Sequence, residues 1–186
     1  MKILRDYLGL FVVSGIIVLL DQWTKWLVRT NLVVGEAWLP GSLSWLMPYA
    51  RIVNWGNTGA AFGMFQGRGM IFTILAIVVA IVIVYYYPRV PAEDWWLRLA
   101  MCLQFAGALG NLVDRITIGP VTDFISVGNF PVFNVADASI TVGVIMMIVG
   151  VWWKDRDEKK KAAASGTSAG EGNAPPVPPG ADQGQD

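Results

Sequence analysis

Four long apolar stretches most constrain what this chain of 186 residues can fold into. A helix needs about 20 mostly apolar residues to cross a bilayer. Stretches of that length cover about 7–28, 70–87, 95–113 and 134–153. We therefore predict an all-α membrane protein with four transmembrane helices. Between the first two helices, about 32–69, turn signals separate short aromatic runs, which predicts a small β-rich extracytoplasmic subdomain.

Basic residues predict on which side of the membrane the helix ends lie. Lys2 and Arg5 precede the first helix, Arg89 and Arg98 flank the link between the second and third, and several lysines and arginines fill 154–161. These regions share one side of an even number of spans, so the positive-inside rule places both termini in the cytoplasm. Residues 1–161 then form the membrane domain. Residues 162–186, rich in Ala, Gly, Ser and Pro, are expected to be a disordered cytoplasmic tail.

The composition excludes several chemistries. The chain contains no histidine and a single cysteine, Cys102. It therefore has no Ser-His-Asp or Cys-His nucleophile, no imidazole metal ligand and no internal disulfide. The formal net charge is zero, so nothing points to nucleic acid as a partner. The long apolar stretches make membrane lipids the expected surroundings, and the protein is expected to be a monomer.

Asp123 and Asp137 are the leading candidates for chemistry. A carboxylate near the bilayer core is costly, so one that remains there is a candidate for function. Asp123 lies in an alternating stretch, 121–127, that predicts a short strand with Asp123 on the side of the apolar residues. Asp137 has a second interpretation, because Asn134 and Asp137 have the spacing of a capping box at a helix start.

Two carboxyl groups in contact do not both ionise easily, and such a pair can activate water as in aspartic proteases. The dipole at a helix N-terminus favours an anion, so Asp137 is the expected carboxylate. Asp123, on a half-buried strand, is the expected holder of the shared proton. The pair titrates as a unit, so the proton could lie on either residue.

Other polar residues gather at helix ends. Asp21 and Lys25 lie one turn apart, which fits a salt bridge with the lysine reaching for the interface, or a role in shaping a site. Asn57 and Gly59 precede the second helix. Gly59 and Gly63 have the spacing of a close helix contact, whereas Asn57 could order a substrate backbone.

The third helix carries further candidates on one face. Gly107 and Asn111 recur at helical spacing with Asp114 or Arg115, so a second chain could approach at the glycine and bond to the polar groups. Asp114 beside Arg115 could instead be a capped helix end with an interfacial ion pair. Polar residues of this helix, among them Gln104, must point into the bundle.

Five short segments together carry a family resemblance. They read LDQWTK (20–25), NTGAAF (57–62), GNLVDR (110–115), GPVTDF (119–124) and FNVAD (133–137). In this order, within four predicted spans over about 7–153, they resemble the bacterial lipoprotein signal peptidases, also called signal peptidase II. Each segment alone is weak evidence for the family, whereas the occurrence of all five in this order is specific to it.

The resemblance implies an aspartic endopeptidase of the bacterial inner membrane, with its active site near the periplasmic face. Such an enzyme removes the signal peptide of prolipoproteins before a cysteine that carries a diacylglyceryl group, and the cyclic peptide globomycin inhibits it. The resemblance makes Asp123 and Asp137 the catalytic pair and implies no metal or cofactor. Residues expected to shape the site and bind substrate are Asp21, Lys25, Asn57, Gly59, Gly107, Asn111, Asp114, Arg115, Asn134 and Ala136.

Two other classes compete with a peptidase. Charged residues within membranes also line the pathways of small transporters, although this chain lacks the duplicated halves of many transporters. The same residues could also hold helices together in an assembly subunit without catalytic activity.

Overall fold

The computed structural model describes residues 2–59 and 67–170, with side chains described for 7–59 and 67–162. The chain divides into two compact units, Met1–Ile148 and Val149–Asp186. The first unit contains all the residues discussed below as site residues. Gly63 and residues 171–186 of the expected tail lie outside the described residues.

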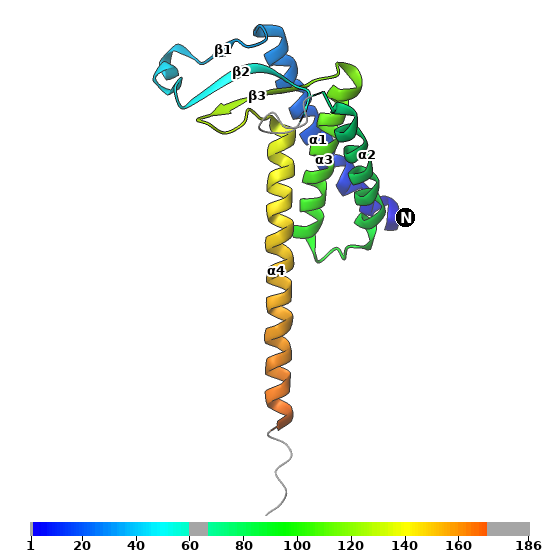
Figure 1. The fold of residues 1–186 in the computed structure, drawn as a ribbon. Helices are drawn as coiled ribbons and strands as arrows, with labels where there is room; N and C mark the ends of the chain where they lie inside the picture. Colours follow the sequence, from blue (N-terminus) through cyan, green and yellow to red (C-terminus); the bar gives the residue numbers. More distant parts are fainter. Residues whose placement is uncertain (1, 60–66, 171–186) are drawn as a thin grey trace, which may run out of the picture. The chain divides into compact units, whose positions relative to one another are not determined.

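Four α-helices, α1 (Lys2–Asn31), α2 (Gly69–Tyr86), α3 (Trp95–Thr117) and α4 (Val135–Gly170), make up most of the described chain (Figure 1). Each contains a stretch long and apolar enough to cross a membrane. The prediction of a four-helix membrane protein is therefore confirmed. Short 3-10 helices, η1 (Gly41–Leu46) and η3 (Tyr87–Arg89), lie in the links.

Helix α4 ends at Gly170, well beyond the expected end near 153, so the first residues of the expected tail are helical. The sequence explains this extension. Lysine, glutamate and alanine, all good helix formers, dominate 158–164. Lys159 also pairs with Asp155 one turn earlier, at 2.7 Å, which supports an exposed helix.

Three strands form an antiparallel sheet in the order β1 (Ala37–Trp38), β2 (Ala50–Asn57) and β3 (Val121–Val127). The first two lie in the predicted β-rich segment, and the third joins them from beyond α3. Strand β2 pairs with β3 so that Trp55 faces Asp123 and Asn57 faces Val121. The sheet therefore brings the end of β2 to the start of β3.

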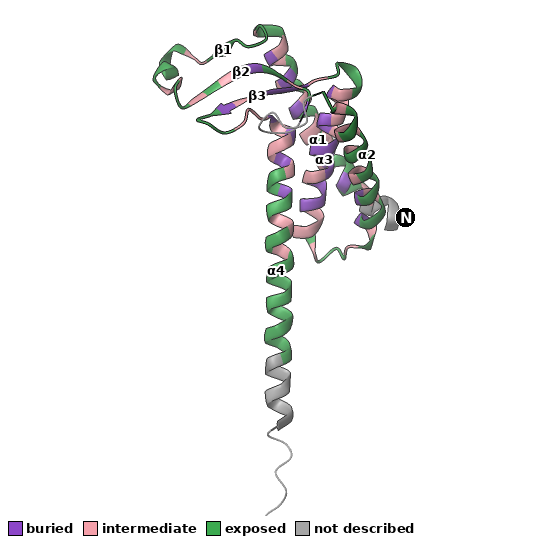
Figure 2. Ribbon diagram, viewed as in Figure 1, coloured by how far each residue is buried: buried purple, intermediate pink, exposed green. Residues whose placement is uncertain are grey.

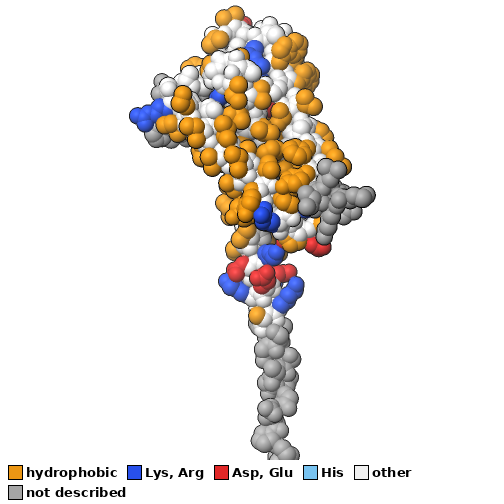
Figure 3. All heavy atoms as spheres, turned by 90° about the vertical axis from the view of Figure 1, so that its right-hand side faces the viewer, with side chains coloured by type: hydrophobic (Ala, Val, Ile, Leu, Met, Phe, Trp, Pro, Cys, Tyr) orange, Lys and Arg blue, Asp and Glu red, His pale blue; other side chains and the backbone are white. Residues whose placement is uncertain are grey.

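Helix α3 is the most buried helix (Figure 2). Half of the residues in its most apolar part are buried, against 17% or less in the other three candidate spans. Helix α2, which carries no charge, is the most exposed, as its sequence predicts. Figure 3 shows apolar side chains over much of one face of the first unit. Such a surface suits contact with lipid tails.

Helices α3 and α4 approach closely at glycines. A Cβ on Gly107 would collide with the carbonyl oxygen of Ala136 and would lie 2.5 Å from Ile140 Cγ1. A Cβ on Gly143 would lie 2.8 Å from the carbonyl oxygen of Ala100. Small residues permit this approach where two membrane helices pack.

We expect Gly107→Ala to destabilise the protein by about 1–3 kcal/mol, because the methyl group overpacks a rigid backbone contact. The matched control is Gly15→Ala in α1, where no atom outside that helix lies within 4 Å of the added Cβ. Thermal unfolding in detergent measures both. Equal melting temperatures for the two variants would contradict the close packing at Gly107.

Candidate active site

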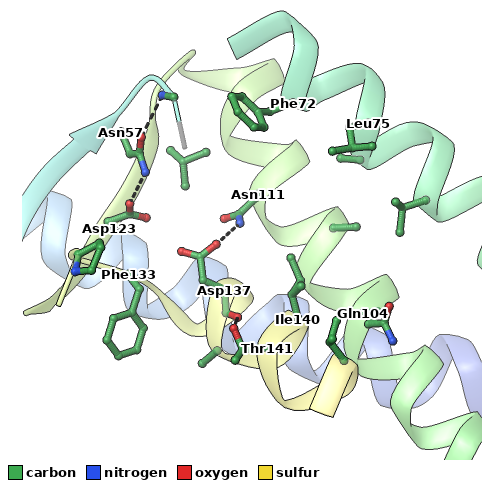
Figure 4. Close-up of a pocket in the computed structure, with 18 of the residues that line it drawn as sticks. Asn57, Phe72, Leu75, Gln104, Asn111, Asp123, Phe133, Asp137, Ile140 and Thr141 are labelled. Carbon is green, nitrogen blue, oxygen red and sulfur yellow. Dashed lines mark hydrogen bonds between the residues drawn. The ribbon is translucent and has the colours of Figure 1, made fainter. Parts of the chain in front are cut away.

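A cavity of about 780 Å³ contains both candidate aspartates (Figure 4). Its polar lining includes Asn57, Asn111, Asp123 and Asp137, and most of the remaining wall is apolar. The apolar residues come mainly from α2, from α4 and from the segment 130–133 that precedes α4. The cavity therefore joins a small acidic site to a larger apolar space.

Strand β3 carries Asp123, whose residue is only 1% exposed. Asn57 Nδ2, at the end of β2, donates to Asp123 Oδ2 at 2.8 Å, and Asn134 Nδ2 donates to Asp123 Oδ1 at 2.7 Å. The backbone N–H of Gly59 donates to Asn57 Oδ1 at 2.9 Å. This bond fixes the amide orientation of Asn57, so its NH₂ group must face the carboxyl group.

Asp137 lies in the first turn of α4, where it forms the predicted capping box with Asn134. The backbone N–H of Asp137 donates to Asn134 Oδ1 at 2.9 Å, and the N–H of Asn134 donates to Asp137 Oδ2 at 3.3 Å. Asn111 Nδ2, from α3, donates to Asp137 Oδ1 at 2.7 Å. The capping and catalytic interpretations of Asp137 are therefore compatible.

Asn134 connects the two aspartates. Phe133 pairs with Ile125 in a β-bridge, so the chain runs alongside β3 immediately before α4 begins. Asn134 therefore reaches Asp123 with its side chain while it caps the helix that carries Asp137. Two segments that are separate in the sequence meet at one residue.

Burial raises the pKa of Asp123 to about 7, and the neighbouring charge of Asp137 acts in the same direction. The amide donors Asn57 and Asn134 and the charge of Lys25 oppose this rise in pKa. A carboxyl group with such a pKa is mostly protonated below about pH 7 and mostly ionised above it.

A second polar cluster, on α1 and α3, is connected to Asp137 through Asn111. Lys25 Nζ bonds to Asp21 Oδ2 at 2.8 Å, Asn111 Oδ1 at 3.0 Å and Asp114 Oδ2 at 3.3 Å. Lys25, Asp21 and Asp114 are each 0% exposed. The three N–H donors of the lysine therefore each have an acceptor, as a buried ammonium group requires.

This cluster also fixes the start of α4. The backbone N–H of Ala136 donates to Asp21 Oδ1 at 2.9 Å. The carboxylate from α1 thus satisfies a free N–H at the N-terminus of another helix. Asp21, Lys25, Asp114 and Ala136 hold the framework together and lie outside the cavity lining.

Two of the alternatives left open by the sequence do not hold. The Asp21–Lys25 salt bridge is present, but the lysine is fully buried and does not reach for the interface. Asp114 pairs with Lys25 and, at 3.4 Å, with Arg29, and not in the alternative ion pair with Arg115. Arg115 instead faces the cavity, with its Cζ 5.7 Å from the centre of the Phe72 ring.

Three further residues belong to this cluster that were not predicted as site residues: Gln22, Arg29 and Thr122. Gln22 Nε2 donates to Asp21, Asp114 and the carbonyl oxygen of Gly110. Arg29 Nη1 donates to Thr122 Oγ1 at 3.1 Å. The spacing of Asp21, Lys25 and Arg29, four residues apart each time, was a signal that all three share one helix face.

The remaining expected residues lie close to the pair. Gly59 and Asn111 line the cavity. Gly107 lies against the first turn of α4 and so sets the distance between α3 and Asp137. No group of three or more acidic or cysteine side chains suited to a metal ion occurs among the described residues.

The fold and the site define a polytopic membrane protein in which one buried carboxyl group, Asp123, and one half-buried carboxyl group, Asp137, line the same largely apolar cavity. A family model described as "Signal peptidase (SPase) II" matches residues 13–153. The chain belongs to the signal peptidase II family, and this membership makes it a membrane peptidase.

Individual relatives agree with this family. The chain is 38% identical over 158 residues to the lipoprotein signal peptidase of Halalkalibacterium halodurans, covering 83% of this chain and 98% of the relative. It is 35% identical over 153 residues to that of Staphylococcus aureus, covering 80% and 90%.

A solved structure described as a bacterial membrane enzyme, determined by the in meso method at 2.3 Å, superposes with a TM-score of 0.72 at 33% identity. The aligned region covers 81% of this chain and 91% of the chain in that structure. A second, at 1.9 Å, gives a TM-score of 0.67 at 33% identity, covering 77% and 92%. The fold is therefore shared by experimentally determined membrane enzymes.

Proposed function

We propose that this protein removes the signal peptide from diacylglyceryl-modified prolipoproteins, cutting before the lipidated cysteine, with Asp123 and Asp137 as the catalytic pair. The observation that carries the proposal is the meeting of these two carboxyl groups at one cavity. Four hydrogen bonds from amide groups hold their oxygens in place. Names and coverage of the relatives support the lipoprotein substrate.

In the proposed reaction Asp137 is the carboxylate and Asp123 carries the proton. Asp137 accepts a proton from water while the water oxygen attacks the scissile carbonyl carbon, and Asp123 donates its proton to the carbonyl oxygen. The tetrahedral intermediate then breaks at the C–N bond, and the departing amine takes the proton from Asp137. Asp123 recovers its proton from the intermediate, so the pair ends as it began.

The charges around the site support a single shared proton. Three cations, Lys25, Arg29 and Arg115, lie close to four carboxyl groups, Asp21, Asp114, Asp123 and Asp137. Three positive charges against four negative ones leave one excess negative charge, which one proton neutralises. A neutral cluster is the least costly state in a medium of low polarity.

The proposed substrate fits the cavity. A lipidated cysteine and an apolar signal peptide need an apolar space, which α2 and α4 provide next to the acidic groups. We propose that globomycin and the substrate occupy this space and that lipids surround the helices. In the proposed orientation both termini are cytoplasmic, and the pair lies near the outer face of the bacterial inner membrane.

Cleavage by purified protein in lipid vesicles tests the proposed substrate. We expect a diacylglyceryl-modified precursor peptide to be cut before its cysteine. The same peptide without the lipid should be cut at least about 10-fold more slowly at equal concentration, because it loses apolar burial in the cavity. Equal cleavage of both peptides would contradict the proposed substrate class.

The rate of this cleavage should vary with pH in a bell shape. Asp123 must be protonated, and its pKa is raised to about 7. The group is neutral below that pH and ionised above it, so kcat should fall as the pH rises past about 7. The acid limb arises when the pair takes up a second proton. A rate that stays constant from acid to alkaline pH would contradict the shared proton.

A further inference from the structure

Gln104 is a polar side chain within the apolar part of the cavity. It lies on α3 seven residues before Asn111, which is two helical turns or about 10 Å along the axis. Both side chains line the cavity, together with Ala108 and Arg115 on the same face of α3. Figure 4 shows Gln104 farther along the helix from the catalytic pair, beyond Ile140.

The amide of Gln104 has a weak partner. In the part of the chain that the structure describes, its Nε2 donates only to the thioether sulfur of Met147, at 3.9 Å. A thioether is a weak acceptor, so most of the hydrogen-bonding capacity of the amide is unused. By contrast, Asn57, Asn111 and Asn134 each donate to oxygen atoms at 2.7–3.0 Å.

An amide in an apolar environment without a good partner costs free energy. Leucine or methionine would fill this position without that cost. The walls around Gln104 are apolar, with Ala76, Val79, Ile140 and Val144 among the lining residues. The amide is therefore placed to meet a polar atom that arrives with an otherwise apolar occupant.

We propose that Gln104 Nε2 donates a hydrogen bond to an ester carbonyl oxygen of the diacylglyceryl group of the substrate. This inference rests on the proposed function and specifies a subsite within it. The glyceryl esters lie several bonds from the cysteine backbone, so they must occupy the cavity at a distance from the pair. An acyl ester also supplies hydrocarbon with acceptors and no donors, which matches one amide among apolar walls.

Two lipopeptide substrates test the proposal. One carries the natural diacylglyceryl thioether, and the other carries two alkyl chains in ether linkage, which have no carbonyl oxygen. We expect the wild-type protein to show a KM about 3–10-fold lower for the ester, the value of one hydrogen bond. Gln104→Leu should raise the KM of the ester to that of the ether and leave kcat unchanged.

The matched control is Thr117→Val, which also removes a polar group from α3. Thr117 is exposed, donates to the carbonyl oxygen of Val113 and lies outside the cavity lining. We expect this variant to keep the preference for the ester. Thermal unfolding of Gln104→Leu checks its fold, and we expect no loss of stability because an apolar residue replaces an amide in apolar surroundings.

Three results would overturn the inference. In the first, the KM values for Gln104→Leu match wild type on both substrates. In the second, the KM rises equally on both substrates, which would indicate that Gln104 bonds to the peptide part that the two substrates share. The wild-type protein could also fail to distinguish ester from ether. The proposed function fails in a different way, if Asp123→Asn retains full turnover of the ester substrate.

Discussion

Replacing either Asp123 or Asp137 with asparagine is expected to lower kcat for the lipidated precursor by about 10²–10⁴-fold or more, because each variant removes one of two proton-transfer groups. Asparagine has nearly the same shape as aspartate and keeps much of the packing. Binding of the substrate should therefore remain, with KM changed far less than kcat. Single-turnover cleavage in lipid vesicles measures both quantities.

The matched control for these variants is Asp155→Asn. Asp155 is exposed on α4 and pairs only with Lys159 among the interactions described. We expect this variant to cleave at the wild-type rate. Full turnover by a folded Asp123→Asn or Asp137→Asn protein would contradict the catalytic assignment, whereas loss of folding in both would favour an assembly role.

Lys25→Met is expected to cost about 3–5 kcal/mol of stability, because it leaves two buried carboxylates without their shared cation. Asp21 and Asp114 would lose contacts of 2.8 and 3.3 Å. Asp21 also caps α4 at Ala136, so the damage should reach the helix that carries Asp137. The yield of folded protein and its melting temperature in detergent measure this effect.

Lys159→Met is a closely matched control for this effect. Lys159 pairs with Asp155 four residues earlier at 2.7 Å, much as Lys25 pairs with Asp21, but its side chain is 76% exposed. An exposed pair of this kind contributes about 0–1 kcal/mol. Equal melting temperatures for the two variants would show that burial adds nothing at Lys25.

The sequence predicts the membrane helices well because their signal is local. Runs of about 20 apolar residues specify where a chain can cross a bilayer, whatever lies around it. The capping box of Asn134 and Asp137 is local too, and the structure contains it. Helix α4 runs past its expected end because the polar residues that end a transmembrane span can continue a helix.

Contacts between distant segments could not be predicted from the pattern alone. Lys25 has the spacing of an interfacial ion pair with Asp21, and only the packing of α1 against α3 shows that it is buried. Asp114 has Arg115 as its sequence neighbour, yet successive residues on a helix point in different directions. Arg115 therefore faces the cavity while Asp114 faces Lys25.

The meeting of Asp123 with Asp137 depends on the sheet. Strand β3 brings Asp123 beside β2, and the bridge between Ile125 and Phe133 returns the chain to β3 just before α4. No periodicity in the sequence encodes that return. The ordered motifs of the family indicated that Asp123 and Asp137 belong together, but they gave no physical reason. The structure gives one, because Asn134 bonds to Asp123 and also caps the helix that carries Asp137.

Infrared spectroscopy of the carboxyl groups tests the shared proton most directly. At about pH 6, below the raised pKa of Asp123, we expect the wild-type protein to show a protonated carboxyl band that disappears in Asp123→Asn. Asp155→Asn should keep the band. A wild-type spectrum without such a band, or a band that persists in Asp123→Asn, would contradict the proposal that this carboxyl group holds the proton.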